Sequence, residues 1–161
     1  MRFYVLDMDT FTYSHSDEDL IDQPIGYWAS AAGETVVHHI RTMLAEAGLT
    51  QPQWWILNQI VAEDGRDKEA VIGTLRGYLS TGDGALHHDI GALHDRGLLT
   101  EDIQGRLRLT DEGRRLRDET AARQQKTRAE IHEGISDEEY VRTLKVLQRM
   151  IHNVGGTAWH H

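Results

Sequence analysis

The chain has 161 residues, no cysteine and a formal net charge of −9 at pH 7, with 39% hydrophobic and 27% charged residues. The absence of cysteine excludes disulfides and thiolate chemistry, so any metal site would depend on histidine and carboxylate ligands. No run approaches the ~18 apolar residues of a membrane span and no signal peptide precedes residue 20, so we expect a cytoplasmic protein without a membrane segment.

The first 24 residues are acidic, with six acids against one base, Arg2. We expect residues 1–24 to form an N-terminal arm that lies across a partner rather than an independent element. From Ile25 onward, apolar residues recur at three- and four-residue spacing as far as Ala47, and Gly48 supplies a stop. The pattern therefore predicts a long helix within residues 25–49.

Residues 50–110 carry the pattern of a small helical domain that ends in a hairpin. Thr50 and Gln53 form a capping box for a helix that ends near residue 64, and shorter helices are predicted at about 68–79 and 84–96. The period then changes from helical spacing to alternation, which predicts two short strands around a turn at Gly105. In the second strand, two leucines alternate with Arg106 and Arg108.

Two further helices are predicted after the hairpin. Thr110 caps a long polar helix over about 111–133, and Gly134 breaks it. Ser136 and Glu139 form a second capping box, and the helix that follows has an apolar seam at alternating spacings of four and three. The seam consists of Tyr140, Leu144, Leu147, Ile151 and Val154. We expect residues 155–161 to be a frayed tail.

Three motifs in this order resemble the multiple antibiotic resistance regulator (MarR) family. They are LTQPQWWIL at the start of the second helix, LHDRGLL at the end of the fourth, and LRLTDEGRRL at the second strand. The resemblance extends from about Ile25 to Val154. It implies a mainly α fold, with a winged helix-turn-helix at 50–110, a two-strand wing, and a helical dimerisation region at 25–49 and 111–154.

The resemblance also implies a homodimeric transcriptional regulator that binds DNA. The helix over about 84–96 would enter the major groove and the wing an adjacent minor groove. The candidate DNA-binding residues are Ala85, His87, His88, Arg76, Arg106, Arg108, Arg114 and Arg115. An alternative stays open for two parts of this set. Arg76 could instead make a structural contact to Asp95 or Glu101. The arginines after residue 113 could instead form a solvated face, paired with nearby acids.

A small aromatic or phenolic ligand is the second partner that the resemblance implies. Its candidate binding residues are Trp28, Trp55, His39 and Tyr27, because aromatic walls stack on flat ligands. Plain core packing is the alternative for the tryptophans, above all for Trp54. We find no signature of a catalytic site or a bound cofactor, and no three or four histidines and carboxylates with the spacing of a metal site.

Two features favour a different function. Only TEDIQGR separates Leu99 from Leu107, which makes the wing short, and residues 67–113 hold five bases and nine acids, a charge of −4. Acidic surfaces repel phosphates. The alternative is a MarR-like scaffold without DNA binding, which binds or transforms a small molecule or binds a protein.

Overall fold

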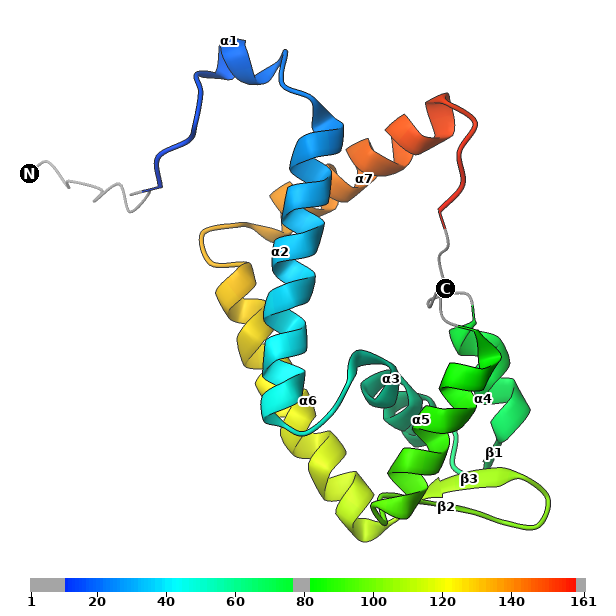
Figure 1. Cartoon of the computed structure of the whole chain (residues 1–161). Coiled ribbons are helices and arrows are strands. Elements are labelled where there is room, and N and C mark those ends of the chain that lie inside the picture. Colours follow the sequence, from blue (N-terminus) through cyan, green and yellow to red (C-terminus); the bar gives the residue numbers. More distant parts are fainter. Residues whose placement is uncertain (1–10, 77–81, 159–161) are drawn as a thin grey trace, which may run out of the picture.

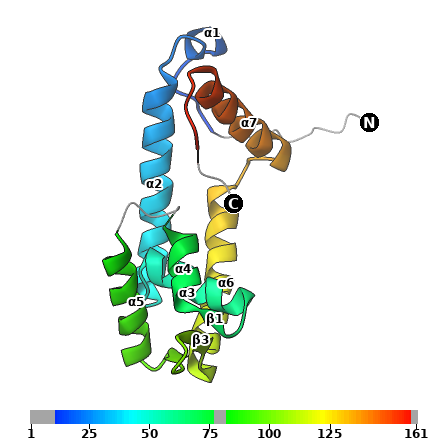
Figure 2. The same cartoon turned by 90° about the vertical axis from the view of Figure 1, so that its right-hand side faces the viewer.

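The computed structural model of the chain describes residues 11–76 and 82–158. Two long helices, α2 and α6, lie side by side, with α1 and α7 at one end and the remaining helices and the sheet at the other (Figures 1 and 2). In chain order the elements are α1 (Asp17–Leu20), α2 (Ile25–Glu46), α3 (Gln51–Ala62), β1 (Arg66–Asp67), α4 (Lys68–Leu75), α5 (Asp83–Asp95), β2 (Leu99–Glu101), β3 (Arg106–Leu109), α6 (Asp111–Ile131) and α7 (Asp137–Asn153).

The predicted helix starts are confirmed by their caps. Both hydrogen bonds of the capping box are present at Thr50 for α3 and at Ser136 for α7. The Thr110 hydroxyl accepts a hydrogen bond from the Gly113 amide at the start of α6. These caps satisfy amide groups that the first helical turn leaves without partners, which is why the sequence predicts the helix starts well.

The hairpin is also confirmed, and a third strand joins it. Strand β3 lies between β1 and β2 in an antiparallel sheet, with Leu99 opposite Leu109 and Arg66 opposite Leu107. The leucines of β3 are buried and its arginines are exposed, as their alternation predicts. Strand β1 has only two residues, too few for an alternating pattern, so the sequence could not predict it.

One hydrophobic core holds α3, α4, α5 and the sheet together, and we call this part the body. Its buried side chains include Trp54, Ile56, Leu57, Ile60, Val71, Ile72, Leu75, Leu86, Ile90, Leu93, Leu99 and Leu107, with Leu44 and Leu49 from the end of α2. The fourth predicted helix is thereby confirmed as α5, with Leu86, Ile90 and Leu93 facing inward. The predicted end of α4 at 77–79 lies outside the described residues.

Helix α6 begins with a close backbone contact to the body. A Cβ atom added to Gly113 would lie 1.9 Å from the Leu98 carbonyl oxygen, so only glycine fits there. The same joint is held by the Thr110 hydroxyl, which donates to the Gly97 carbonyl at 2.6 Å. The LTDEG part of the third motif therefore has a direct structural reason.

The opposite end of the chain, formed by α1, the first turns of α2, and α7, buries very little. Helix α7 contains no buried residue. Large apolar side chains are exposed along these elements, namely Ile21, Ile25, Tyr27, Trp28, Val141, Leu144, Met150 and Val154. We call this part the helical end. Helix α1, capped by Ser16, is a short element inside the segment for which we expected none. Among the helices described, none is long and apolar enough to cross a membrane.

Candidate nucleic-acid interface and ligand pocket

Helix α5 presents a polar face to solvent. Because Leu86, Ile90 and Leu93 are buried, the opposite face of α5 points away from the core. Ala85, His87 and His88 are all exposed there, as the sequence predicts for residues that read base edges. The imidazole Nε2 of His87 lies 3.6 Å from a carboxylate oxygen of Glu69.

Arg76 and Asp83 form an ion pair that links α4 to α5. The guanidinium Nη2 lies 2.6 Å from the Asp83 carboxylate, and Nε donates a second hydrogen bond at 2.9 Å. This pairing lowers the pKa of the Asp83 carboxyl below its ordinary value. The alternative contact of Arg76 with Asp95 or Glu101 is therefore wrong. The partner is the acid at the start of the next helix, and the Asp83 carboxylate competes with a phosphate for the Arg76 guanidinium.

Asp89 belongs to the acids that we expected to repel DNA, but its side chain packs against α3. It is half-buried, and Gln53 Nε2 donates a hydrogen bond to it at 3.5 Å. Burial raises the pKa of the Asp89 carboxyl. The same Gln53 caps α3, so the residue that starts this helix also contacts the face of α5 beside it.

The wing turn is tight and its acids have local partners. The Asp102 carboxylate accepts hydrogen bonds from the backbone amides of Gln104 and Arg106, at 2.8 and 3.0 Å, which lowers the pKa of its carboxyl. Glu101 forms an ion pair with Lys68 at 2.8 Å. Asp102 therefore stabilises the turn and Glu101 neutralises Lys68 beside it, although the net charge of the region stays negative.

The predicted cations on the wing and α6 differ in their surroundings. Arg108 lies 2.6 Å from Asp64 and covers Gly65, where a Cβ would come within 2.8 Å of the guanidinium, and Arg114 approaches the same carboxylate at 3.7 Å. Arg106 is exposed, and no ion pair to it occurs in the described part of the chain. The sequence did not indicate a role for Asp64, because no local pattern links it to Arg108 or Arg114, which follow it by 44 and 50 positions.

Arg115 follows the alternative interpretation of the arginine run. Its guanidinium lies 3.0 Å from Glu119 and 3.5 Å from Glu112, at helical spacings of four and three. Arg117 instead turns toward the body, where it donates a hydrogen bond to Asn58 at 3.1 Å. The run is thus a mixture of solvated pairs and a structural contact.

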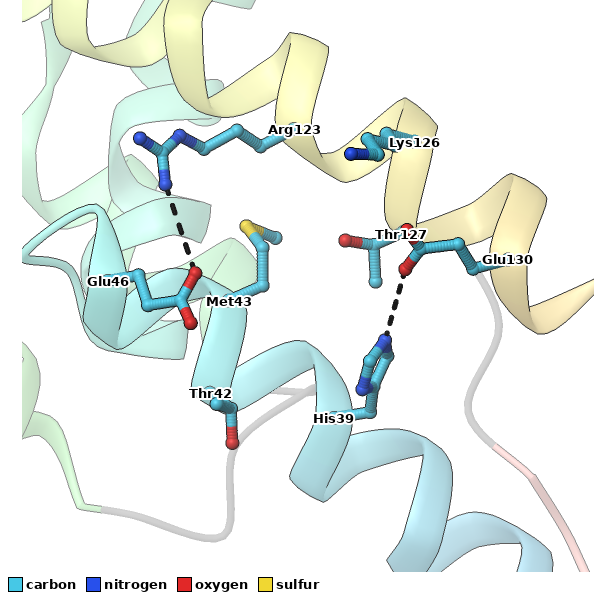
Figure 3. A pocket seen from close by; sticks show the side chains of 8 residues that line it. All are labelled: His39, Thr42, Met43, Glu46, Arg123, Lys126, Thr127 and Glu130. Carbon is cyan, nitrogen blue, oxygen red and sulfur yellow. Dashed lines mark ion pairs between the residues drawn. The ribbon is translucent and has the colours of Figure 1, made fainter.

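A pocket of about 300 Å³ lies between α2 and α6 (Figure 3). Ion pairs join the two helices at its ends: His39 with Glu130 at 3.5 Å, and Arg123 with Glu46 at 4.0 Å. The side chains of α6 that extend between these pairs are Lys126 and Thr127 (Figure 3). The lining consists of His39, Thr42, Met43, Glu46, Arg123, Lys126, Thr127 and Glu130.

Of the four predicted ligand-binding residues, His39 alone lines this pocket. Tyr27 and Trp28 stack edge to face on the exposed start of α2, with ring centroids 5.3 Å apart. Trp55 is half-buried and packs against the core. Trp54 is buried in the core, as its alternative interpretation proposed. The charged lining of the pocket could not be predicted, because it depends on how α2 and α6 are aligned.

The histidines do not gather into a metal centre in residues 11–76 and 82–158. No group of three or more histidines and carboxylates there has the arrangement to hold a metal ion. His87 and His94 both line a second hollow, of about 320 Å³, between α5 and the wing, together with Lys68, Glu101 and Asp102.

Comparison with known proteins gives a consistent fold. No family model and no curated protein matches the sequence. Among solved structures, the PcaV transcriptional regulator of Streptomyces coelicolor is 26% identical, with a TM-score of 0.69, over 84% of this chain and 100% of that chain. CouR of Rhodococcus jostii, solved with p-coumaroyl-CoA, is 26% identical with a TM-score of 0.63, over 81% and 93%. A MarR family protein of Mycobacterium tuberculosis in complex with DNA is 20% identical with a TM-score of 0.63, over 80% and 98%.

The helix pair α4–α5 and the hairpin β2–β3 define a winged helix protein. The two long helices α2 and α6, together with the structural neighbours, narrow the class further. The chain has the winged helix fold of MarR family transcriptional regulators, the family that its three motifs resemble.

Proposed function

We propose that the protein is a homodimeric transcriptional regulator that works in the cytoplasm, binds DNA through α5 and the wing, and responds to a small organic ligand. The exposed face of α5 carries the proposal. It presents Ala85, His87 and His88 beside a hairpin whose Arg106 is exposed. A structural neighbour of this fold was solved with DNA. Ala85, His87 and His88 would meet base edges, and Arg106 would meet the phosphate backbone.

Dimerisation is part of the proposal, and the helical end supports it. Helix α7 carries an apolar seam but buries no residue, and the start of α2 exposes Ile25 and Trp28. Faces of this kind are stabilised when a second subunit covers them. We propose residues 25–49 and 111–154 as the dimerisation region, with residues 50–110 as the DNA-binding domain.

For the ligand we propose a small organic acid, of the aromatic kind that the sequence predicts. Structural neighbours were solved with salicylic acid and with p-coumaroyl-CoA. The pocket between α2 and α6 offers the cations Arg123 and Lys126 to a carboxylate. We propose it as the binding site, with His39 as a hydrogen-bonding group at its far end.

Fluorescence anisotropy with DNA from upstream of the gene tests the DNA-binding role. The wild type should bind, and Arg106→Ala should weaken binding and make the slope of log affinity against log salt shallower by about 2, roughly 0.9 for each of two wings. Arg149→Ala removes the same charge from α7, at the opposite end of the molecule, and should leave the slope unchanged. Absence of binding to any duplex at low salt would overturn the regulator.

Calorimetric titration with salicylate tests the pocket. Lys126→Ala should weaken salicylate binding by about tenfold, because a carboxylate loses a charge-assisted partner. Trp55→Ala separates the two proposed ligand sites, since it should reduce binding only if the ligand stacks on the predicted aromatic wall. Equal affinity for salicylate in the wild type and both variants would contradict both proposed ligand sites, the pocket and the aromatic wall.

The charge of residues 67–113 favours a second candidate, a MarR-like scaffold without DNA binding. Nine acids and five bases on the surface that would face phosphates give −4. Local pairs such as Arg76 with Asp83 do not change that sum. In this case salicylate binding should survive while every duplex fails to bind, so the two titrations together separate the candidates.

A further inference from the structure

The carboxylate of Asp64 contacts two arginines that come from different elements. Its Oδ2 accepts a hydrogen bond from Arg108 Nη1 at 2.6 Å, and its Oδ1 lies 3.7 Å from Arg114 Nη2. Arg108 belongs to β3, Arg114 to the first turn of α6, and Asp64 to the turn that leads from α3 to β1. One acid therefore faces two cations at the junction of the wing and α6.

The glycine after Asp64 gives the Arg108 guanidinium a defined place. Gly65 has a φ of +73°, and a Cβ atom on it would lie 2.8 Å from Arg108 Nη2, so the guanidinium lies against the backbone of this turn. The Gly65 amide donates to the Leu107 carbonyl at 3.0 Å, which ties the turn to the residue before Arg108. The turn that carries Asp64 is therefore aligned with β3, and this alignment keeps the acid beside Arg108.

The three side chains are open to solvent and therefore within reach of a phosphate. Those of Asp64, Arg108 and Arg114 are 53%, 48% and 52% exposed. An exposed ion pair adds little to the stability of a fold. A guanidinium binds carboxylate and phosphate oxygens through the same N–H donors. A DNA phosphate that approached these arginines would thus meet a carboxylate that occupies their donors and repels it.

We propose that Asp64 is an internal competitor of DNA phosphates, whose carboxylate keeps Arg108 and Arg114 from neutralising the backbone and so limits the affinity for any duplex. This inference rests on the proposed DNA-binding function and assigns a role to an acid outside α5 and the wing. Arg106 is exposed without an ion pair among the residues described, so it stays available to a phosphate. Phosphate contacts supply affinity that is independent of sequence. Limiting them leaves binding more dependent on the bases that α5 contacts.

Fluorescence anisotropy of the full-length protein with an upstream duplex and a random duplex tests the competition. Asp64→Asn removes the charge but keeps an oxygen that accepts the hydrogen bond from Arg108. We expect it to bind both duplexes roughly tenfold more tightly, with a slope of log affinity against log salt steeper by about 2–4, roughly 0.9 for each guanidinium released in two subunits. Asp22→Asn makes the same change in the turn after α1, at the helical end, and should bind like the wild type.

A double-mutant cycle shows whether the two arginines carry the effect. In a protein that also has Arg108→Ala and Arg114→Ala, Asp64→Asn should change neither the affinity nor the salt slope. Melting temperatures from circular dichroism should agree among these proteins, because the ion pairs are exposed. Unchanged or weaker DNA binding by Asp64→Asn, or a gain that persists without the two arginines, would overturn the competition and leave the regulator intact. If neither the wild type nor Asp64→Asn binds any duplex at low salt, both proposals are wrong.

Discussion

The body buries side chains from each of its helices, from Trp54 in α3 to Leu93 in α5, whereas α7 at the helical end buries none. The body therefore has a core of its own. The helical end has amphipathic helices whose apolar faces meet solvent in the single chain. Each Å² of apolar surface that is buried contributes about 25 cal/mol to stability. The body gains this free energy within one chain, whereas the helical end would gain it only when a partner covers its apolar faces. Mutations should accordingly act on folding in one region and on assembly in the other.

The largest effect is expected from Leu147→Asp in the seam of α7. An unpaired charge buried in a dimer interface costs several kcal/mol, so the variant should dissociate or unfold. Light scattering measures the mass against the 18.3 kDa of one chain. Asn153→Asp adds the same charge elsewhere on α7 and should stay dimeric. A stable monomer in the wild type at micromolar concentration would contradict the proposed dimer.

Gly113→Ala should be the most damaging small change in the joint between the body and α6. Its Cβ would overlap the Leu98 carbonyl oxygen, and relief requires the backbone to shift, which costs about 3 kcal/mol or more. Gly91→Ala in α5 is the control, because its Cβ meets nothing within 4 Å and alanine favours a helix by roughly 0.5–1 kcal/mol. Urea unfolding should show a lower free energy of unfolding for Gly113→Ala and a higher one for Gly91→Ala than for the wild type.

Ser136→Ala should have a smaller effect, confined to the helical end. Losing the capping side chain costs about 1 kcal/mol, so α7 amides should exchange with solvent roughly fivefold faster while those of α5 stay unchanged. Ser30→Ala removes a hydroxyl that donates a hydrogen bond to Glu34 within α2, and it serves as the control. Equal acceleration in α5 and α7 would mean that the two regions unfold together.

The smallest effect is expected from the pH dependence of the wing. The pKa of Asp102 is lowered in the folded state, so its contribution to stability is complete above the ordinary value of 3.8 and is lost as pH falls through the folded value. Asp102→Asn should flatten this acid limb, because an amide oxygen still accepts the backbone bonds but does not titrate. Urea midpoints measured from pH 5 to pH 2 check it, and parallel curves for the two proteins would contradict the assignment.

The features that the sequence predicts well are those with local causes. The caps at Thr50, Thr110 and Ser136, and the alternation of β3, each depend on residues within four positions of one another. These local signals define the helix starts and the hairpin. The three motifs then indicate the order in which the elements pack.

The features that escaped prediction depend on tertiary contacts. Asp64 meets Arg108 across 44 positions, and His39 meets Glu130 across 91, so no periodicity reveals either pair. For the same reason, the alternative interpretation of Arg76 named Asp95 or Glu101 as its partner and not Asp83. Side-chain charge alone did not show that Asp89 would pack against Gln53 rather than face solvent.

The close approach of Gly113 to Leu98 has a mechanical consequence. In most contacts between helices, the side chains that lie between them can change rotamer and so accommodate a small shift of one helix. At this joint the backbone of α6 touches the backbone that leaves α5, and no side chain lies between them to absorb a displacement. A displacement of the first turn of α6 therefore acts directly on the segment that connects α5 to the wing.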